Sequence, residues 1–218
     1  MSRIAILGAG KVGTVLARLA LAVGHEVHIA GSGPASQIAL TVEVLAPGAQ
    51  AAEAPSPSDT TVLDGAELVV LALPLGRFTE LDPTLLTGHV VVDAMNHWRE
   101  TDGDRPDLSG PGISTSHLVQ EHLAGATVVK GFNHMGYHDL EAGARPAGDP
   151  DRRALAIAGD DSAALARVAS VVDDLGFDPL VLDSLAAGIH LQPGNPSFGA
   201  NLSVDALRAL LPAAATLA

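Results

Sequence analysis

Short runs of aliphatic residues recur along the chain and alternate with stretches whose apolar residues have helical spacing. The aliphatic runs cover residues 3–7, 26–30, 67–73, 89–94, 127–132, 153–159 and 178–183. Because these runs are apolar at nearly every position, they are typical of strands in a parallel sheet that is covered on both faces. Residues 11–23 and 162–175 repeat apolar side chains at helical intervals and stop before Gly24 and Gly176, which predicts a crossover helix in each.

The order of strands and helices predicts an α/β fold: a Rossmann-type doubly wound, mostly parallel sheet with a small C-terminal α/β extension. We expect residues 1–150 to form the main domain, and residues 151–218 to pack on the same sheet and close the substrate cleft. Residues 46–60 are rich in Ala, Pro and Ser, and residues 99–116 are polar and rich in Gly, so both predict surface loops. Ligands of such a sheet bind at the carboxyl ends of its strands, where we expect the site.

The composition limits what the chain can bind. It has 218 residues, no cysteine, a formal net charge of −13 and only 3% aromatic residues. Nucleic acids and anionic membrane surfaces need clustered Lys and Arg, which the sequence lacks, so neither is expected as a partner. Disulfides and thiolate sites are excluded, and no apolar stretch approaches the roughly 18 residues of a membrane span. We therefore expect a cytoplasmic protein.

A glycine-rich turn directly follows the first predicted strand and opens the first predicted helix. It reads Gly8-Ala9-Gly10-Lys11-Val12-Gly13, the GxGxxG pattern. The glycines allow a tight turn and a close approach of the backbone to a pyrophosphate, while the helix N-terminus offers free N–H groups. In this context the turn predicts dinucleotide binding, although an ordinary strand-to-helix turn would also be compatible with the pattern.

The end of the second predicted strand indicates which dinucleotide is bound. An Asp or Glu there would hold the ribose hydroxyls of NAD, but the chain has Gly31-Ser32-Gly33. The missing carboxylate removes the repulsion against a 2′-phosphate, and Ser32 can donate a hydrogen bond to it, which favours NADP. No Lys or Arg follows Ser32 until Arg77. Lys11 and Arg18 are the nearest cations in sequence, and Lys11 could approach the phosphate from the turn.

Three later segments, each at the end of a predicted strand, should open onto the same face as the glycine turn. These segments are residues 72–75, 93–98 and 130–138. Lys11 and Lys130 are the only lysines of the chain, so their presence in the turn and in the third segment favours a ligand cleft. Any single residue there, such as Asn96 or Asn133, is equally compatible with capping a loop. We expect no metal, because His134 and His138 have helical spacing but no evident third ligand.

Taken together, these motifs make the chain resemble the family of NADP-dependent oxidoreductases of the deazaflavin coenzyme F-420. The resemblance extends over nearly the full chain and is carried by ILGAGKVG, the GS after the second strand, VVLALP, VVVDAMN, VVKGFNHMGYHDL and AGIHLQPGNPSFGANL. It implies a domain that binds NADP across the strand ends, with the deazaflavin stacked on the nicotinamide and a hydride passing directly between the two. The chain departs from the family at Gly33, where relatives usually carry Arg.

The resemblance also implies roles for individual residues. Residues 8–13 would hold the pyrophosphate, and Gly31 and Ser32 the adenosine phosphate. Leu73 and Pro74 would contact the nicotinamide ribose, and Asn96 and Asn133 the nicotinamide side of the cleft.

Hydride transfer between two planar rings needs orientation more than acid–base help. Lys130, Asn133 and His134 are the residues we expect at the reacting end, with a small-molecule electron acceptor as the partner. If the acceptor is instead a small imine or carbonyl compound, a proton donor is required, and His134, His97, Tyr137 and Lys130 are the candidates. A third hypothesis is a non-catalytic sensor that binds NADP. The segment 187–202 could close the cleft or join two subunits of a homodimer.

Overall fold

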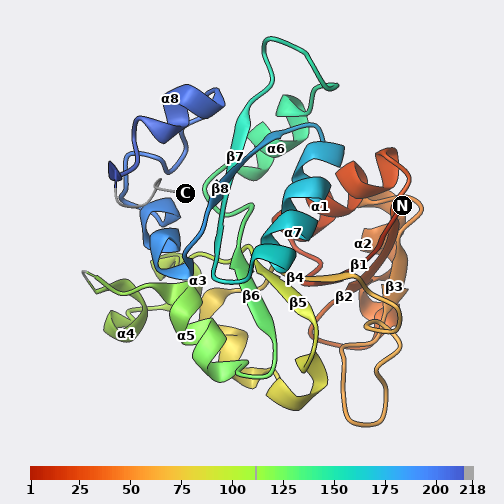
Figure 1. Cartoon of the computed structure of the whole chain (residues 1–218). Coiled ribbons are helices and arrows are strands. Elements are labelled where there is room, and N and C mark those ends of the chain that lie inside the picture. Colours follow the sequence, from red (N-terminus) through yellow and green to blue (C-terminus); the bar gives the residue numbers. More distant parts are fainter. Residues whose placement is uncertain (111, 214–218) are drawn as a thin grey trace.

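The computed structural model describes residues 1–110 and 112–213, which form an α/β fold around one eight-stranded sheet (Figure 1). The strands are β1 Arg3–Leu7, β2 Glu26–Ala30, β3 Gln50–Ala52, β4 Leu68–Leu71, β5 Val90–Asp93, β6 Thr127–Lys130, β7 Ala154–Gly159 and β8 Asp178–Leu182. Their order in the sheet is β3-β2-β1-β4-β5-β6-β7-β8, and only the β6–β7 pair is antiparallel. The predicted Rossmann-type, mostly parallel sheet is confirmed.

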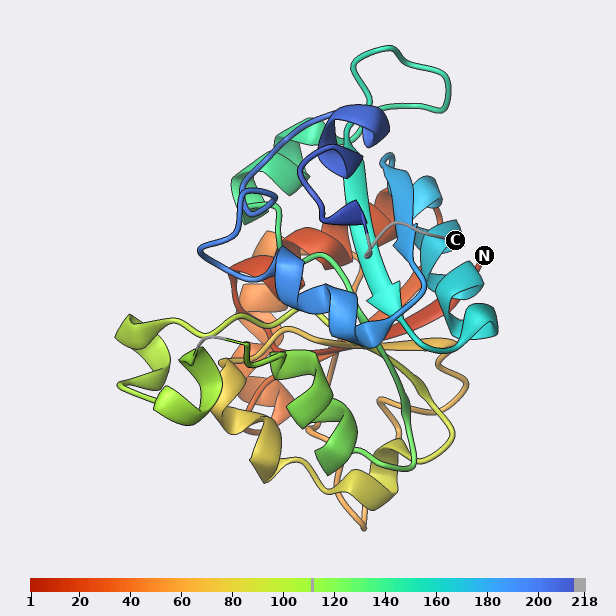
Figure 2. The same cartoon turned by 60° about the vertical axis from the view of Figure 1, so that its left-hand side comes forward.

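Helices cover both faces of this sheet. The α-helices are α1 Lys11–Ala22, α2 Ala35–Leu45, α3 Arg99–Asp102, α4 Pro106–Ser109, α5 Thr115–His122, α6 Tyr137–Gly143, α7 Ser162–Asp174 and α8 Val204–Arg208. Three segments are 3₁₀-helices: η1 Leu75–Glu80, η2 Pro83–Leu86 and η3 Leu185–Leu191. Helices α1, α2, α6 and α7 contribute to one core, whereas η1, η2, α4 and α5 contribute to the core on the opposite face. Figure 2 shows the two layers from a second side.

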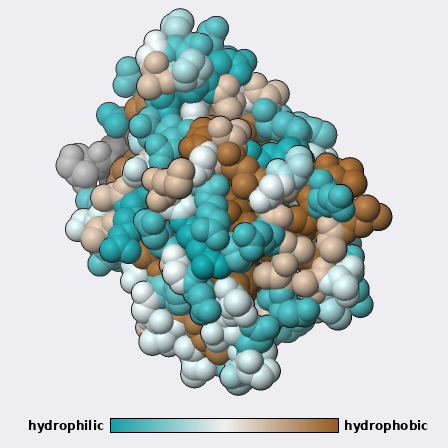
Figure 3. All heavy atoms as spheres, turned by 90° about the vertical axis from the view of Figure 1, so that its right-hand side faces the viewer, coloured by the Kyte–Doolittle hydropathy of each residue, from teal (hydrophilic) through white to brown (hydrophobic). Residues whose placement is uncertain are grey.

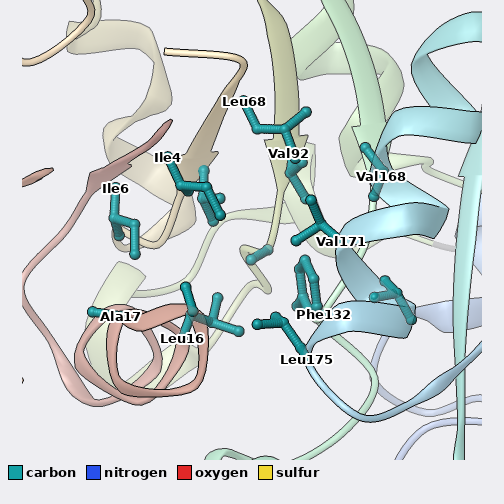
Figure 4. Close-up of a cluster of buried hydrophobic side chains, with 14 of the residues drawn as sticks. Ile4, Ile6, Leu16, Ala17, Leu68, Val92, Phe132, Val168, Val171 and Leu175 are labelled. Carbon is teal, nitrogen blue, oxygen red and sulfur yellow. The ribbon is translucent and has the colours of Figure 1, made fainter. Parts of the chain in front are cut away.

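Alternation along the strands explains why the sheet carries two cores. On β1, Ile4 and Ile6 belong to the core with α1 and α7, whereas Ala5 and Leu7 belong to the opposite core. In Figure 4, Leu16 of α1 lies beneath Ile4, and Val171 of α7 lies beside Val92. Strands that are buried on both faces must be apolar throughout, which is the pattern seen in the sequence.

The structure differs from the predictions in two surface segments. The segment 46–60 contains the edge strand β3, which pairs with β2 through three residues, Gln50 to Ala52. Its apolar content is low because an edge strand is covered less than a central one, so no aliphatic run marks it. The segment 99–116 contains the one-turn helices α3 and α4 and the first residues of α5.

The C-terminal part continues the same sheet. Strand β7 joins β6 by a short antiparallel pairing in which Val129 faces Gly159 and Lys130 faces Ala158, and β8 then pairs with β7 in parallel. Helix α8 and η3 cover β7 and β8 in a third, smaller core. The division into residues 1–150 and 151–218 stays a prediction.

The surface carries apolar side chains among polar ones, as Figure 3 shows for one face. On α2, the side chains of Leu40, Val44 and Leu45 are exposed. The predicted homodimer has no direct test here and stays a prediction. Within the described residues, no helix has the length and apolar content needed to cross a membrane.

Candidate functional site

The first cavity lies at the carboxyl ends of β1, β2 and β4 and has a volume of about 590 Å³. The predicted cofactor residues that line it are Gly8, Ala9, Gly10, Gly31, Ser32, Leu73 and Pro74. Segments that are far apart in the sequence therefore meet around one space, as expected for strand ends at one edge of a parallel sheet. The predicted residues Lys11, Val12 and Gly13 do not line this cavity.

The glycine turn has the geometry that a pyrophosphate requires. Gly8 has φ +128°, and an added Cβ would lie 2.2 Å from the carbonyl oxygen of Ala72. A Cβ on Gly13 would lie 1.9 Å from the carbonyl oxygen of Gly8, so both positions exclude any side chain. Gly10 differs, because an added Cβ would meet nothing within 4 Å and would project into open space. Helix α1 begins after Gly10 with no side-chain cap and no acidic residue in its first turn, which leaves N–H groups for an anion.

Charged groups at the first cavity include one cation, Arg77, which the sequence alone could not place. Arg77 lies on η1 and lines the cavity together with Glu80 and Asp82. Its Nε and Nη2 donate to Glu80 Oε2 at 2.9 and 2.6 Å. Near Ser32, a carboxylate approaches from the end of β3, because Glu53 Oε1 accepts a hydrogen bond from the Ala35 N–H at the start of α2. The only hint in the sequence was that Arg77 is the first cation after Ser32.

A second cavity, of about 350 Å³, lies beyond the end of β5. Its described walls come from three segments and consist of Asn96 and His97, of Leu108, Ser109, Gly110, Gly112, Ile113 and Thr115, and of Ile189, Gln192, Pro193, Gly194 and Asn195. Among the predicted cofactor residues, Asn96 is the one that lines it. The loop after β4 is tied to this region, since the Gly76 N–H donates to Asp102 Oδ1 at 2.8 Å.

Two of the predicted nicotinamide residues, Asn96 and Asn133, are bonded to each other. Asn133 Nδ2 donates to Asn96 Oδ1 at 3.0 Å and to the Leu191 carbonyl at 2.7 Å, and Asn96 Nδ2 donates to the Asn133 carbonyl at 2.8 Å. Asn133 Oδ1 is buried without a hydrogen-bond partner in the structure. A buried acceptor of this kind is costly unless a ligand donates to it. The preceding residue, Phe132, has φ 60°, a strained conformation that is typical of functional sites.

Lys130 has a different place from the one predicted. Its side chain is 0% exposed, and its Nζ donates to Asp93 Oδ2 at 3.1 Å and to the Met95 carbonyl at 2.6 Å. Ser116 Oγ and the Met95 N–H also donate to the Asp93 carboxylate. Burial lowers the pKa of the Lys130 ammonium, and Asp93 opposes this effect. The prediction of a catalytic Lys130 is therefore corrected: the ammonium holds the Met95–Asn96 backbone and has no access to a ligand.

His134 is likewise withdrawn from the cleft. Its side chain is fully buried, and its Nε2 accepts a hydrogen bond from the Ala156 N–H of β7 at 2.9 Å. Burial lowers the pKa of His134 to about 4, and the Ser197 backbone only partly opposes this shift. At neutral pH the ring is uncharged and linked to the sheet, so the predicted catalytic role is replaced by a structural one.

The buried His134 predicts a specific loss of stability in acid. Because its pKa is about 4 in the folded chain and near 6.5 when unfolded, the unfolded chain binds the proton more tightly. The free energy of unfolding should therefore fall as the pH drops from 6.5 to 4, by roughly 3 kcal/mol from this group. Urea unfolding of the wild type and of His134→Gln across this range measures the difference. Parallel pH profiles for the two proteins would contradict this assignment.

Among the residues that the structure describes, no three His, Asp or Glu side chains are grouped as metal ligands. His138 is exposed, whereas His134 is buried. Lys11 lies at the start of α1 with its Nζ 5.2 Å from the centroid of the Tyr137 ring. It is exposed at the edge of the glycine turn, where it remains a candidate for contact with a phosphate.

Comparisons with known proteins show which sequences and structures this chain is similar to. A family model described as NADP oxidoreductase, coenzyme F-420-dependent, matches residues 3–97. A hypothetical protein of Sinorhizobium meliloti, SMa0349, is 31% identical with a TM-score of 0.75, and the alignment covers 93% of this chain and 96% of that one. A candidate F-420-dependent NADP-reductase of Arthrobacter sp. FB24 is 28% identical with a TM-score of 0.70, covering 86% and 87%. No curated protein sequence matches the chain.

More distant structures share the fold alone. An imine reductase from a Pseudomonas species is 19% identical with a TM-score of 0.57, and the alignment covers 87% of this chain but 59% of that longer one. The family model covers the glycine turn and the strand ends through Asn96, and the relative from Sinorhizobium meliloti aligns over almost the whole of both chains. The chain therefore belongs to the family of coenzyme F-420-dependent NADP oxidoreductases and is an NADP-dependent oxidoreductase.

Proposed function

We propose that the chain transfers a hydride between NADP(H) in the first cavity and the deazaflavin coenzyme F-420, whose ring occupies the second cavity. The observation that carries this proposal is the Asn96–Asn133 pair at the ends of β5 and β6, with Asn96 in the wall of the second cavity. Asn133 is 3% exposed and lines neither cavity, and its Oδ1 has no donor among the described residues. In this proposal an amide N–H of the bound nicotinamide reaches that oxygen and satisfies it. NADP(H) supplies or accepts the hydride.

The residues of the first cavity fit a dinucleotide phosphate. Gly8 and Gly10 have no side chain that would block a pyrophosphate, and the free N–H groups of α1 favour its negative charge. In this proposal Ser32 and Arg77 hold the 2′-phosphate, with Gly31 at the end of β2 beside them. Leu73 and Pro74 shape the ribose side. Arg77 takes the part that Arg at position 33 plays in relatives.

Arg77 is free to change partners. Its ion pair with Glu80 is exposed, and exposed ion pairs contribute little to stability. We therefore expect Arg77→Met to weaken NADPH binding about tenfold while leaving NADH binding nearly unchanged, since only NADPH has the phosphate. Calorimetric titration with both nucleotides measures the two affinities. An equal loss for NADPH and NADH would contradict this role of Arg77.

The chain's own residues act by binding and orienting, without a proton donor. Hydride transfer between two rings requires that the reacting carbons be close and aligned, and the buried Asn133 and the tied Asn96 provide rigid contacts for this. Lys130, paired with Asp93, donates to the Met95 carbonyl and so holds the backbone directly before Asn96 in place. No step needs the Lys130 ammonium or the His134 ring at the ligand.

The direct test is spectroscopic. Micromolar protein mixed with NADPH and oxidised F-420 should bleach the deazaflavin absorbance, and the reverse mixture of NADP and reduced F-420 should restore it. Arg77→Met should slow the bleaching at subsaturating NADPH and the recovery of absorbance at subsaturating NADP. Absence of any absorbance change in either direction would reject F-420 as the acceptor.

A second candidate is the reduction of a small imine or carbonyl compound, favoured by one observation. Of the proton donors expected for that chemistry, His97 lines the second cavity, whereas Lys130 and His134 are buried. Its Nε2 lies 3.2 Å from the Gly103 carbonyl. Oxidation of NADPH by a cyclic imine, lost in His97→Phe, would support this reading over F-420.

A further inference from the structure

The second cavity has an uncharged lining. The polar side chains in its walls are Asn96, His97, Ser109, Thr115, Gln192 and Asn195, and the remaining described lining residues are Gly, Pro, Leu and Ile. No Lys, Arg, Asp or Glu is among the described residues that line it. Its volume, about 350 Å³, is at the lower end of the range of small-molecule sites, about 300–1,000 Å³. It suits a planar ring with neutral polar edges.

Hydrogen bonds make these walls rigid. Gln192 Oε1 accepts from the Thr115 N–H at 2.9 Å and from Thr115 Oγ1 at 3.1 Å, and Gln192 Nε2 donates to the Ile113 carbonyl at 3.0 Å. Asn195 Nδ2 donates to the Ile189 and Gln192 carbonyls, both at 3.0 Å. The Gln192 amide thus joins the segment before α5 to the segment after η3, whereas the Asn195 amide fixes the turn that follows η3. Because the walls are cross-linked, the cavity cannot easily widen for a long substituent.

The segment beside this cavity is acidic. Residues 99–107, which follow His97 and Trp98, carry four carboxylates and two guanidinium groups. Both arginines are already paired, Arg99 with Asp104 at 3.7 Å and Arg105 with Asp107 at 2.7 Å. The segment folds back onto the cavity, because Asp102 Oδ2 accepts from the Trp98 N–H and Gly103 O lies beside His97. In Figure 2, α3 and α4 form the green lobe that projects outward from the sheet.

An acidic border next to a neutral cavity determines which acceptors bind well. None of the four carboxylates lines the cavity, so they act on an anionic substituent that leaves it on the side of residues 99–107, and they repel that substituent through screened Coulomb interactions. We infer that the second cavity selects an acceptor with an uncharged ring and no polyanionic tail, so that deazaflavin without its phosphate and glutamate tail is used better than the complete coenzyme. This inference rests on the proposed function and adds the class of acceptor.

The test compares two acceptors that differ only in the tail. We expect kcat/KM for the tail-free deazaflavin riboside to exceed that for the complete coenzyme by about fivefold at low salt, with the ratio shrinking as salt is raised. A preference for the tailed form, or equal use of both, would overturn the inference. Binding of each acceptor to the NADP complex, followed by quenching of deazaflavin fluorescence, gives the same comparison without turnover. If neither is reduced but the tail-free form binds better, the proposed function fails and the inference stands.

A charge variant tests whether the carboxylates of residues 99–107 cause the repulsion. Glu100 is exposed on α3, and Glu100→Lys should raise kcat/KM for the tailed form about fivefold without changing that for the tail-free form. Glu43→Lys, on the exposed face of α2, makes the same charge change away from the second cavity and is the matched control. Equal effects of the two variants would overturn the inference, because the net charge of the chain would then explain them.

Discussion

Replacing Gly10 with alanine is expected to weaken NADPH binding about a hundredfold while the stability of the fold falls by only about 1 kcal/mol. In the structure an added Cβ at this position meets nothing within 4 Å, and Gly10 has φ −84°, which alanine adopts freely. The alanine methyl group would therefore occupy only the space through which the pyrophosphate approaches the backbone. Gly10 is also the N-cap of α1, where alanine is less favourable than glycine by about 1 kcal/mol, which is smaller than the expected loss of binding.

Calorimetric titration with NADPH and thermal unfolding of the ligand-free protein measure the two effects separately. Gly13→Ala is the contrasting variant, because its Cβ would lie 1.9 Å from the Gly8 carbonyl oxygen, so that stability and binding should fall together. Undiminished NADPH binding by Gly10→Ala would show that the pyrophosphate does not lie on this turn.

The second large effect concerns stability. Lys130→Met is expected to lower the free energy of unfolding by about 3–5 kcal/mol, because it leaves the Asp93 carboxylate buried without its cation. Both side chains are 0% exposed, so water cannot replace the lost ammonium. Ser116 Oγ and the Met95 N–H still donate to Asp93, which keeps the loss within this range. Denaturant unfolding measures the change.

The double variant Asp93→Asn with Lys130→Met separates the burial of an unpaired charge from the loss of packing. Removing both charges should recover part of the stability, since an uncharged asparagine costs less to bury than a lone carboxylate. A double variant less stable than Lys130→Met would contradict this explanation. If Lys130→Met has the same free energy of unfolding as the wild type but no longer turns over substrate, Lys130 would act at the ligand.

Much of the fold follows from local patterns. The aliphatic runs locate seven of the eight strands, because a strand buried on both faces must be apolar throughout. Gly24 and Gly176 mark the ends of α1 and α7 because both have positive φ, which glycine adopts without strain. Strand β3 was not predicted, because its three residues, Gln50 to Ala52, are too few and too little buried to form an aliphatic run.

The candidate site was predicted less evenly. Gly8, Ala9, Gly10 and Ser32 were predicted from their places after the first and second strands, and Leu73 and Pro74 from the family resemblance. All six line the first cavity, whereas Lys11, Val12 and Gly13 do not. Arg77 was not assigned, because it reaches that cavity from η1, a separate segment beyond β4. Lys130 and His134 were misassigned because polar residues at a strand end can face a ligand or the core, and their spacing is the same in both cases.

The sequence by itself predicted a doubly wound, mostly parallel sheet and seven of its eight strands, because these depend on apolar periodicity and on glycines within a few neighbouring residues. It also indicated the carboxyl ends of the strands as the place where a ligand is expected. Only the tertiary structure decided which polar side chains are available. Asp93 and Ser116 enclose Lys130, and β7 supplies the N–H that binds His134. The burial and pairing of Lys130 and His134 depend on segments that are distant in the chain, so a local sequence pattern does not predict them.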